Sequence, residues 1–259
     1  MTGMANPGGR FTVGMTLQEW PTIVTAERQQ RYHDAAEVPE GLFGDVTDLS
    51  ILANDTILAT RYLKTEEVDG LHAGQRMQQA EPVRLGEPLT LKGRVAEVRP
   101  SSRGRFVTFA FDFVRLDGGV PVRGELVSFR PDRAVRNEGS HDARAADLAG
   151  FEPVAEKHLT PERVGGYSFE FPDYRVHFDP AAAASVGLRA PVAQGLMSFT
   201  WITEALARDG VPREVAIGAS FRRPLFWDDT ARVLRRGREI VVVNGDGALC
   251  SRGEITHLR

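Results

Sequence analysis

The sequence of 259 residues contains a single cysteine, Cys250. One cysteine excludes an internal disulfide and any metal site built from several thiolates, and it is typical of a cytosolic protein. Charge of one sign is not in excess either, because 32 Lys and Arg oppose 35 Asp and Glu, for a formal net charge of -3. Bulk charge therefore gives no reason to expect a nucleic-acid partner.

Long hydrophobic runs are also missing. The stretch 1–11 lacks the apolar core of a signal peptide, and no apolar run approaches membrane-spanning length. There is no GxxxxGK[ST] phosphate loop, no GxGxxG fingerprint, no GxSxG nucleophile elbow and no HExxH zinc motif. We therefore expect a cytoplasmic protein without a membrane partner. The absence of the four motifs gives no support for a phosphate loop, a dinucleotide-binding fingerprint, a serine nucleophile elbow or an HExxH zinc site.

What the first half does contain is two helix signals. Thr25 and Asp48 are residue types that cap helix N-termini, and each precedes a helical pattern. The first predicted helix covers 26–37. The second covers 49–63 and repeats its large apolar residues roughly at helical spacing, so it is expected to be the central helix of this half.

Strands follow the second helix. Four segments within 69–132 are separated by Gly, Pro, Ser and Asp turns, and the third alternates cleanly at Phe109, Phe111 and Phe113. A helix followed by a meander of long strands that can wrap it is the plan of a hotdog unit. The pattern predicts such a unit over 11–133.

The second half follows a polar stretch, 134–150, whose lack of large apolar residues predicts a linker. Its expected elements repeat the plan of the first half. Within 151–259 they are a strand at 167–171, the stretch 172–195, a helix at 196–210 and three strand segments between 215 and 258.

Two sequence echoes support a duplication. EPVRLGEPL at 81–89 resembles RPLFWDDTA at 223–231, and Arg-Gly-Glu occurs both at 123–125 and at 252–254. Both echoes fall in the same order, which favours a repeated unit over chance. We predict an α+β fold with two hotdog units side by side, each with a central helix wrapped by an antiparallel sheet.

The most informative stretch is 172–197, PDYRVHFDPAAAASVGLRAPVAQGLM. It resembles the MaoC-like (R)-specific enoyl-CoA hydratase and hydroxyacyl-thioester dehydratase family, where an Asp-x-Asn-Pro-hydrophobic-His motif precedes a Pro-Ile-Ala-His-Gly corner. The run YRVHFD at 174–179 is similar to the mitochondrial-type hydroxyacyl-thioester dehydratases and mesaconyl-CoA hydratases. The residues in register with the family pattern are His177, Asp179, Ala183, Gly187, Pro191 and Gly195.

The resemblance implies a substrate class as well as a fold. It implies an acyl thioester of coenzyme A or of an acyl-carrier protein, with no metal or redox cofactor, and a first unit that is non-catalytic and accommodates the acyl chain. The chain departs from the pattern at two positions. Pro172 stands where the family has its catalytic Asp, and Gln194 stands where the corner has His.

Water addition to an enoyl thioester needs a proton-transfer group and donors for the thioester oxygen. His177 is the candidate acid/base, since imidazole exchanges protons near neutrality. Gly195 N–H, at the start of a helix, is the candidate oxyanion donor, although a glycine there is also an ordinary turn residue. Asp173 is the candidate partner of His177, because in a regular strand both would face one side. Glu170 would face the other side.

Further candidates concern substrate binding. Asp179 followed by Pro180 has a structural account, as N-cap and first helical residue. Charged or polar side chains near the motif could contact the substrate's phosphates or acyl group, although surface arginines are common. The candidates are Gln194 and Leu196 at the corner, Arg175 and Arg189 for phosphates, and His72 and Arg76 along an acyl tunnel.

Two alternative functions follow from the same residues. The loss of the family acid at Pro172 is also compatible with a degenerate hotdog that binds an acyl thioester or a partner subunit without catalysis. A hotdog thioesterase would need a carboxylate on or near the central helix, and Glu204 is the candidate. A double hotdog can be complete alone or can pair again as a homodimer.

Overall fold

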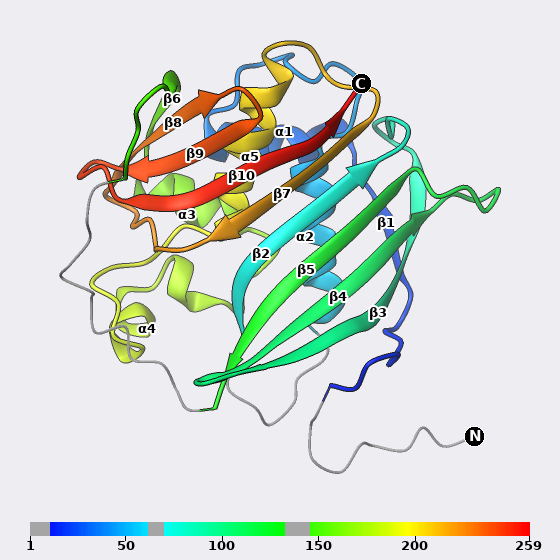
Figure 1. The fold of residues 1–259 in the computed structure, drawn as a ribbon, viewed down its shortest axis with the longest axis horizontal. Helices are drawn as coiled ribbons and strands as arrows, with labels where there is room; N and C mark the ends of the chain where they lie inside the picture. Colours follow the sequence, from blue (N-terminus) through cyan, green and yellow to red (C-terminus); the bar gives the residue numbers. More distant parts are fainter. Residues whose placement is uncertain (1–10, 62–69, 133–145) are drawn as a thin grey trace.

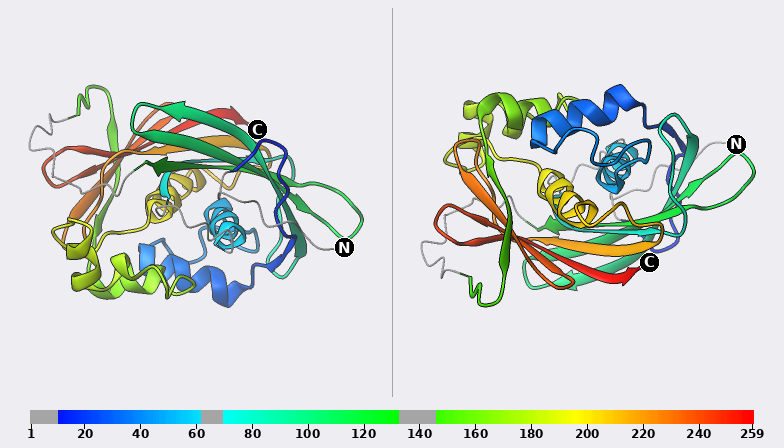
Figure 2. Two further views of the ribbon diagram at one scale, coloured as in Figure 1. Left: turned by 90° about the horizontal axis from the view of Figure 1, so that it is seen from below. Right: turned by 90° about the horizontal axis from the view of Figure 1, so that it is seen from above.

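The computed structural model describes residues 11–61, 70–132 and 146–259. Its ten strands form one antiparallel sheet that curves around two helices, α2 (Leu49–Thr60) and α5 (Gly195–Ala207) (Figure 1). On the side of these helices that faces away from the sheet lie α1 (Ala26–Ala36) and α3 (Pro161–Tyr167) (Figure 2). The result is three layers, with α2 and α5 side by side in the middle.

The sheet has the order β1-β3-β4-β5-β2-β7-β10-β9-β8-β6. Strands β2 and β7 pair at its centre, with Met77 opposite Ile217, so the two halves share one continuous sheet. The first half contains β1 (Trp20–Ile23), β2 (Leu71–Gln79), β3 (Pro88–Ser101), β4 (Gly104–Val114) and β5 (Val122–Pro131). The second half contains β6 (Glu152–His158), β7 (Val215–Phe221), β8 (Thr230–Arg236), β9 (Glu239–Asn244) and β10 (Leu249–Leu258), with η1 (Arg175–His177) and α4 (Pro180–Ser185) before α5.

The repeated Arg-Gly-Glu triplets lie at corresponding positions of β5 and β10. A Cβ added to Gly124 would lie 3.5 Å from Cγ2 of Thr56 on α2, and one added to Gly253 would lie 2.8 Å from Cγ2 of Ile202 on α5. In the second half the glycine therefore allows the central helix to lie close against the sheet. In the first half a Cβ would meet α2 only at ordinary van der Waals distance, and the nearer atom is Sδ of Met77 at 3.1 Å.

The second echo also occupies matching places. An isolated β-bridge joins Val46 to Arg84 just before α2, and another joins Val192 to Phe226 just before α5. In each half, the residues just before the central helix thus pair with the residues just before the third strand, which is β3 in the first half and β8 in the second. This correspondence makes Asp48, the N-cap of α2, the counterpart of Gln194, the N-cap of α5.

Helix starts follow the sequence signals. The side chain of Thr25 accepts a hydrogen bond from the N–H of Arg28, and that of Asp48 accepts one from the N–H of Ser50. The α+β class and the antiparallel sheet are confirmed. The end of the second predicted helix (62–63) and most of the predicted linker (134–145) lie outside the described residues.

Three predictions of local structure are wrong. Residues 167–171 are not a strand, because Thr160 caps a helix that begins at Pro161, and the chain then turns from Ser168 to Phe171. Strand β6 lies before that helix and was not predicted. Four strands, not three, follow α5, since β8 and β9 are separated by a tight turn at Gly237, whose φ is 57°.

None of the described helices is long and apolar enough to cross a membrane.

Candidate active site

His177 is placed by a short chain of local caps. Asp179 accepts hydrogen bonds from the N–H groups of Ala181 and Ala182 and so begins α4, with Pro180 as its first residue. These hydrogen bonds lower the pKa of the Asp179 carboxyl. The single turn η1 precedes this cap and ends at His177, so the motif histidine lies on a helical turn and not on a strand.

The imidazole of His177 is anchored to the corner that opens α5. Its Nδ1 lies 2.7 Å from the carbonyl oxygen of Val192. A carbonyl oxygen can only accept, so Nδ1 carries the proton and Nε2 keeps a lone pair. Burial lowers the pKa of His177, although the bond to Val192 acts in the opposite direction. The ring is therefore neutral at pH 7, with a basic nitrogen available.

The start of α5 has no side-chain cap. Gln194 is the N-cap residue, yet its side chain makes no capping bond, and its Nε2 instead donates to Ser168 Oγ at 3.0 Å. The first N–H groups of a helix have no partner within the helix and carry the positive end of its dipole. At Gly195, which is partly exposed, this group is consequently suited to bind an oxygen that gains negative charge.

Gly195 is required for packing at this point. A Cβ on Gly195 would lie only 2.9 Å from Cγ of Phe221, the last residue of β7. The aromatic ring thus lies directly against the start of the helix, which gives the glycine a structural reason beside the predicted functional one.

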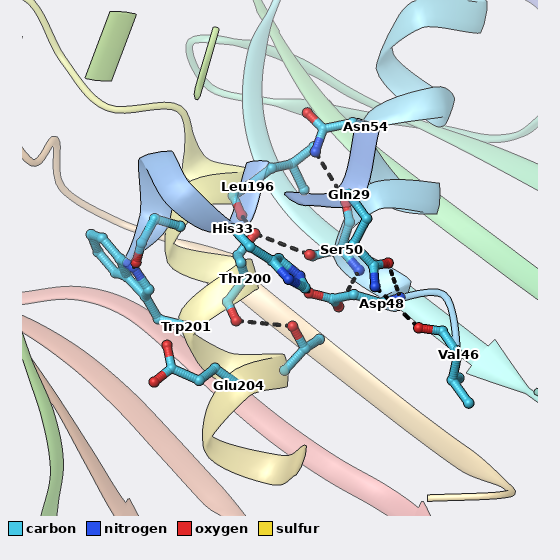
Figure 3. A network of polar contacts seen from close by, with 12 residues as sticks. Gln29, His33, Val46, Asp48, Ser50, Asn54, Leu196, Thr200, Trp201 and Glu204 are labelled. Carbon is cyan, nitrogen blue, oxygen red and sulfur yellow. Dashed lines mark hydrogen bonds and ion pairs between the residues drawn. The ribbon is translucent and has the colours of Figure 1, made fainter. Parts of the chain in front are cut away.

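The corresponding start of α2 is closed (Figure 3). Asp48 Oδ1 accepts from the N–H of Ser50 at 2.9 Å, and Asp48 Oδ2 lies 3.1 Å from Nε2 of His33. Gln29 donates from Nε2 to the carbonyl oxygen of Val46 at 3.2 Å, as His177 does to Val192 in the second half. The first half therefore has an amide in place of the imidazole, and a carboxylate where an oxyanion would have to bind.

Asp173, the predicted partner of His177, lies elsewhere. Its side chain is 65% exposed, and Arg61 donates to its Oδ2 at 3.2 Å. The chain turns between Phe171 and Tyr174, so the strand geometry that would align Asp173 with His177 does not exist. The structure does not bring these two residues together.

Glu170 instead belongs to a partly buried ion cluster, in which Asp55 is the only charged group that is fully buried. Arg28 of α1 donates to Glu170 at 2.9 and 2.8 Å and to Asp55 of α2 at 2.6 Å. Tyr32 donates to Glu170 at 2.6 Å, and Thr22 donates to Asp55 at 2.8 Å. Burial raises the pKa of Asp55, and the positive charge of Arg28 opposes this shift. The cluster links the two halves of the chain.

Sequence reasoning missed this cluster. Neither Arg28 nor Asp55 was among the candidate site residues. The one available signal is that Asp55 is the only charged residue of the helix at 49–60. A charged residue inside such a helix requires a buried partner.

His72 is brought to the site and Arg76 is not. The register of β2 against β5 shifts between His72 and Gly74, a bulge that redirects the histidine. Its ring packs edge-on against Phe221, with centroids 4.7 Å apart, and burial lowers the pKa of His72 to about 4. Arg76 is 69% exposed and pairs with Glu125 at 2.9 Å on the outer face of the sheet.

The other residues predicted to contact the substrate already pair with neighbouring side chains or are buried. Arg175 pairs with Asp179, while Arg189 pairs with Asp228 at 2.8 Å and Asp229 at 2.6 Å. Both arginines are about half exposed or more, so phosphates could still reach them. Leu196 is fully buried, backbone included, so the structure does not show it accessible to a substrate.

Glu204 is held in a buried ion pair. Its two carboxylate oxygens accept from Nζ of Lys157 at 2.7 Å and from Nη2 of Arg208 at 2.7 Å. Burial lowers the pKa of Lys157, and Glu204 opposes that shift. With both oxygens engaged and 1% of the side chain exposed, Glu204 is not positioned to attack a thioester.

Within the described ranges, no group of three or more His, Cys, Asp or Glu residues could hold a metal ion.

Comparisons with known proteins identify the fold. No protein-family model matches the chain, and no curated protein matches its sequence. Among solved structures, a MaoC-like dehydratase superimposes with a TM-score of 0.75 and 14% identity, covering 95% of this chain and 98% of that chain. A MaoC-like dehydratase from Phytophthora capsici gives 0.70 and 17%, covering 95% and 97%.

An acyl-ACP thioesterase from Bacteroides thetaiotaomicron is less similar, with a TM-score of 0.57 and 9% identity over 92% of this chain and 96% of that one. The fold is therefore the double hotdog of the MaoC-like dehydratases, as the sequence motif predicted.

Proposed function

We propose that the protein is a hydro-lyase that interconverts a 2-enoyl thioester and a 3-hydroxyacyl thioester. The observation that carries this proposal is the juxtaposition at the corner before α5. His177 is neutral and anchored through Nδ1 to Val192, and the helix that starts just after Val192 has no side-chain cap. The turn η1 supplies a base, and the start of α5 supplies donors for the oxyanion.

Hydration would begin with the thioester oxygen accepting from the N–H of Gly195. Nε2 of His177 removes a proton from water, the water oxygen bonds to C3, and the π electrons move onto the thioester as an enolate. The imidazolium then returns the proton to C2, which gives the 3-hydroxyacyl thioester. The same steps in reverse give dehydration. Water is the only molecule added or released, so atoms and protons balance.

In this account His177 performs both proton transfers. Asp173 is exposed and paired with Arg61, so we assign it no catalytic part. Gln194 acts as a positioning residue, because its bond to Ser168 keeps its side chain away from the N–H groups of α5.

The carrier is proposed to be coenzyme A or an acyl-carrier phosphopantetheine, supported by the MaoC-like fold. Arg175 and Arg189, on the exposed surface around the motif, are the proposed phosphate contacts. Cytoplasmic location, the absence of a cofactor and pairing as a homodimer stay predictions from the sequence.

The second candidate is a hotdog that binds an acyl thioester without turning it over. Pro172 in place of the family acid favours it, as does the exposed position of Asp173. A thioesterase has less support, since Glu204 is fully engaged by Lys157 and Arg208.

The test is to incubate the protein with trans-2-enoyl-CoA substrates and follow both the enoyl-thioester absorbance and the release of free thiol. Loss of the absorbance band without thiol release supports the hydro-lyase. Thiol release that Glu204→Gln abolishes would support the thioesterase instead. Binding without either change would identify the non-catalytic hotdog.

A further inference from the structure

The segment 168–177 connects the two sides of the candidate site. Its backbone forms three successive turns, each closed by an N–H group that donates to the carbonyl oxygen three residues earlier, at 2.8 to 3.2 Å. The donors are Phe171, Tyr174 and His177. Ser168, where the segment begins, accepts through Oγ from Gln194 at 3.0 Å. The segment therefore contacts the residue that begins α5 and ends at the candidate base.

The beginning of this segment lies against α1 of the first half. Glu170 accepts from Nε and Nη2 of Arg28 at 2.9 and 2.8 Å and from the hydroxyl of Tyr32 at 2.6 Å. The ring of Phe169 packs against that of Tyr32, with centroids 4.7 Å apart. Burial raises the pKa of Tyr32 well above its ordinary value, so the phenol keeps its proton and continues to donate. Arg28 and Tyr32 both belong to α1, which lies beside α3 in the outer helical layer (Figure 2).

Beyond Phe171 the segment runs over the surface. Phe171 is buried, whereas residues 172–175 are exposed. Ion pairs between exposed side chains contribute little, so those that 172–175 form hold the backbone weakly. The next firm contact is at the corner before α5, where the N–H of Val192 donates to the carbonyl oxygen of Val176 at 3.1 Å. The position of His177 therefore depends on one anchor at this corner and on another at α1.

We propose that Glu170 is a positioning residue, through which α1 of the first half holds the base His177 in place. The inference rests on the proposed hydro-lyase, in which the position of this ring decides the rate. A misplacement of about 1 Å can lower a rate by about 10²-fold, so a loosened anchor lowers kcat. The first half, which the sequence predicted to be non-catalytic, thereby has a role in holding the base.

Glu170→Gln changes the anchor without changing its size. The amide oxygen can still accept from Tyr32, but the amide NH2 group cannot accept from Arg28. Tyr32→Phe removes one hydroxyl and is the milder second variant if Glu170→Gln does not fold. Arg163→Gln is the matched control, because Arg163 pairs at 2.9 Å with Glu37, the C-cap residue of α1. That pair joins the same helix to the second half outside the segment.

The first measurement is nitrogen NMR of the His177 ring at pH 7, assigned by comparison with His177→Ala. In wild type we expect separate signals from one protonated and one unprotonated nitrogen, because the bond to Val192 selects a single tautomer. In Glu170→Gln that bond should weaken, so the two signals should move toward each other as the tautomers exchange. Arg163→Gln should keep the wild-type spectrum.

The second measurement is kcat and KM for hydration of a trans-2-enoyl-CoA. Glu170→Gln should lower kcat by about tenfold and Tyr32→Phe by about threefold, while KM stays within about twofold and Arg163→Gln follows wild type. Ring signals unchanged by Glu170→Gln would overturn the inference even if activity fell. A wild-type kcat in Glu170→Gln, with or without a higher KM, would overturn it too.

The two proposals can fail separately, because the ring signals do not require turnover. Absence of hydration by wild type would refute the hydro-lyase, and exchange-averaged ring signals in Glu170→Gln would still support the anchor. An active wild type whose Glu170→Gln variant matches it in spectrum and kcat would refute the anchor and keep the hydro-lyase.

Discussion

Nδ1 of His177 lies 2.7 Å from the carbonyl oxygen of Val192, and this contact fixes both the position and the tautomer of the ring. In the first half the equivalent contact is made by the amide of Gln29, which cannot exchange protons. The two halves share one framework, but the side chain that contacts this carbonyl oxygen is titratable only in the second half. The candidate site is therefore asymmetric within a symmetric fold.

The pH dependence of activity follows from the burial of His177. Its pKa is lowered below the ordinary value of about 6.5, so the neutral base persists to lower pH than a free histidine would allow. We expect kcat/KM for hydration to be flat near neutrality and to decline only as pH falls below about 6.5. The check is kcat/KM between pH 5 and 8, and a decline centred above 6.5 would contradict the assignment.

Gln194→Asp should give α5 the cap that α2 already has. Aspartate at an N-cap accepts from the first N–H groups, as Asp48 does from Ser50. Relative to Gln194→Ala, the aspartate variant should gain about 1 kcal/mol in free energy of unfolding. Hydration should nevertheless fall by about 10²-fold or more, because its carboxylate competes with the thioester oxygen.

Urea unfolding and steady-state assays of both Gln194 variants measure these opposite effects. An active Gln194→Asp enzyme would show that the helix start does not bind the substrate oxygen.

Arg28→Ala should destabilise the protein by about 3 kcal/mol, because it leaves Asp55 and Glu170 without their shared cation. The pKa of Asp55, already raised by burial, would rise further without Arg28, so protonation at low pH relieves the penalty. The loss measured by urea unfolding should be larger at pH 8 than at pH 5. Asp55→Asn in the same background should restore part of it, and an equal loss at both pH values would argue against a buried charge.

Stability should also depend on His72. Its pKa is about 4 in the folded protein and about 6.5 when unfolded, so between these values the unfolded state binds the extra proton. This contribution to the free energy of unfolding is present above pH 6.5 and is lost as pH falls toward 4. His72→Asn should flatten that part of the pH profile. A variant that kept the wild-type slope would show that His72 does not cause it.

The sequence predicted the features that depend on residues close together in the chain. Thr25, Asp48 and Asp179 cap the helices that they precede because capping requires only the next few residues. The same reasoning failed at 167–171, whose alternating aromatic residues imitate a strand while the cap at Thr160 determines a helix. Arg28 and Glu170 could not be paired from the sequence, since folding alone brings two such distant segments together.

His177 and Gly195 could be singled out from the sequence because the motif is contiguous and its spacing is specific. Their catalytic roles stay predictions. The exposed position of Asp173 was missed because Pro172 and the following turn change the direction of the backbone, which a strand-based argument does not foresee. The contact between His72 and Phe221 depends on the pairing of β2 with β7, which joins the two halves.

The most direct test of the account is the enoyl-thioester absorbance of crotonyl-CoA and longer trans-2-enoyl-CoAs, compared between wild type, His177→Ala and Asp173→Asn. We expect wild type to remove the band, His177→Ala to lose about 10²-fold or more in rate while keeping its circular dichroism spectrum, and Asp173→Asn to stay near wild type. Full turnover by His177→Ala, or no reaction by wild type with any substrate, would contradict the proposed chemistry.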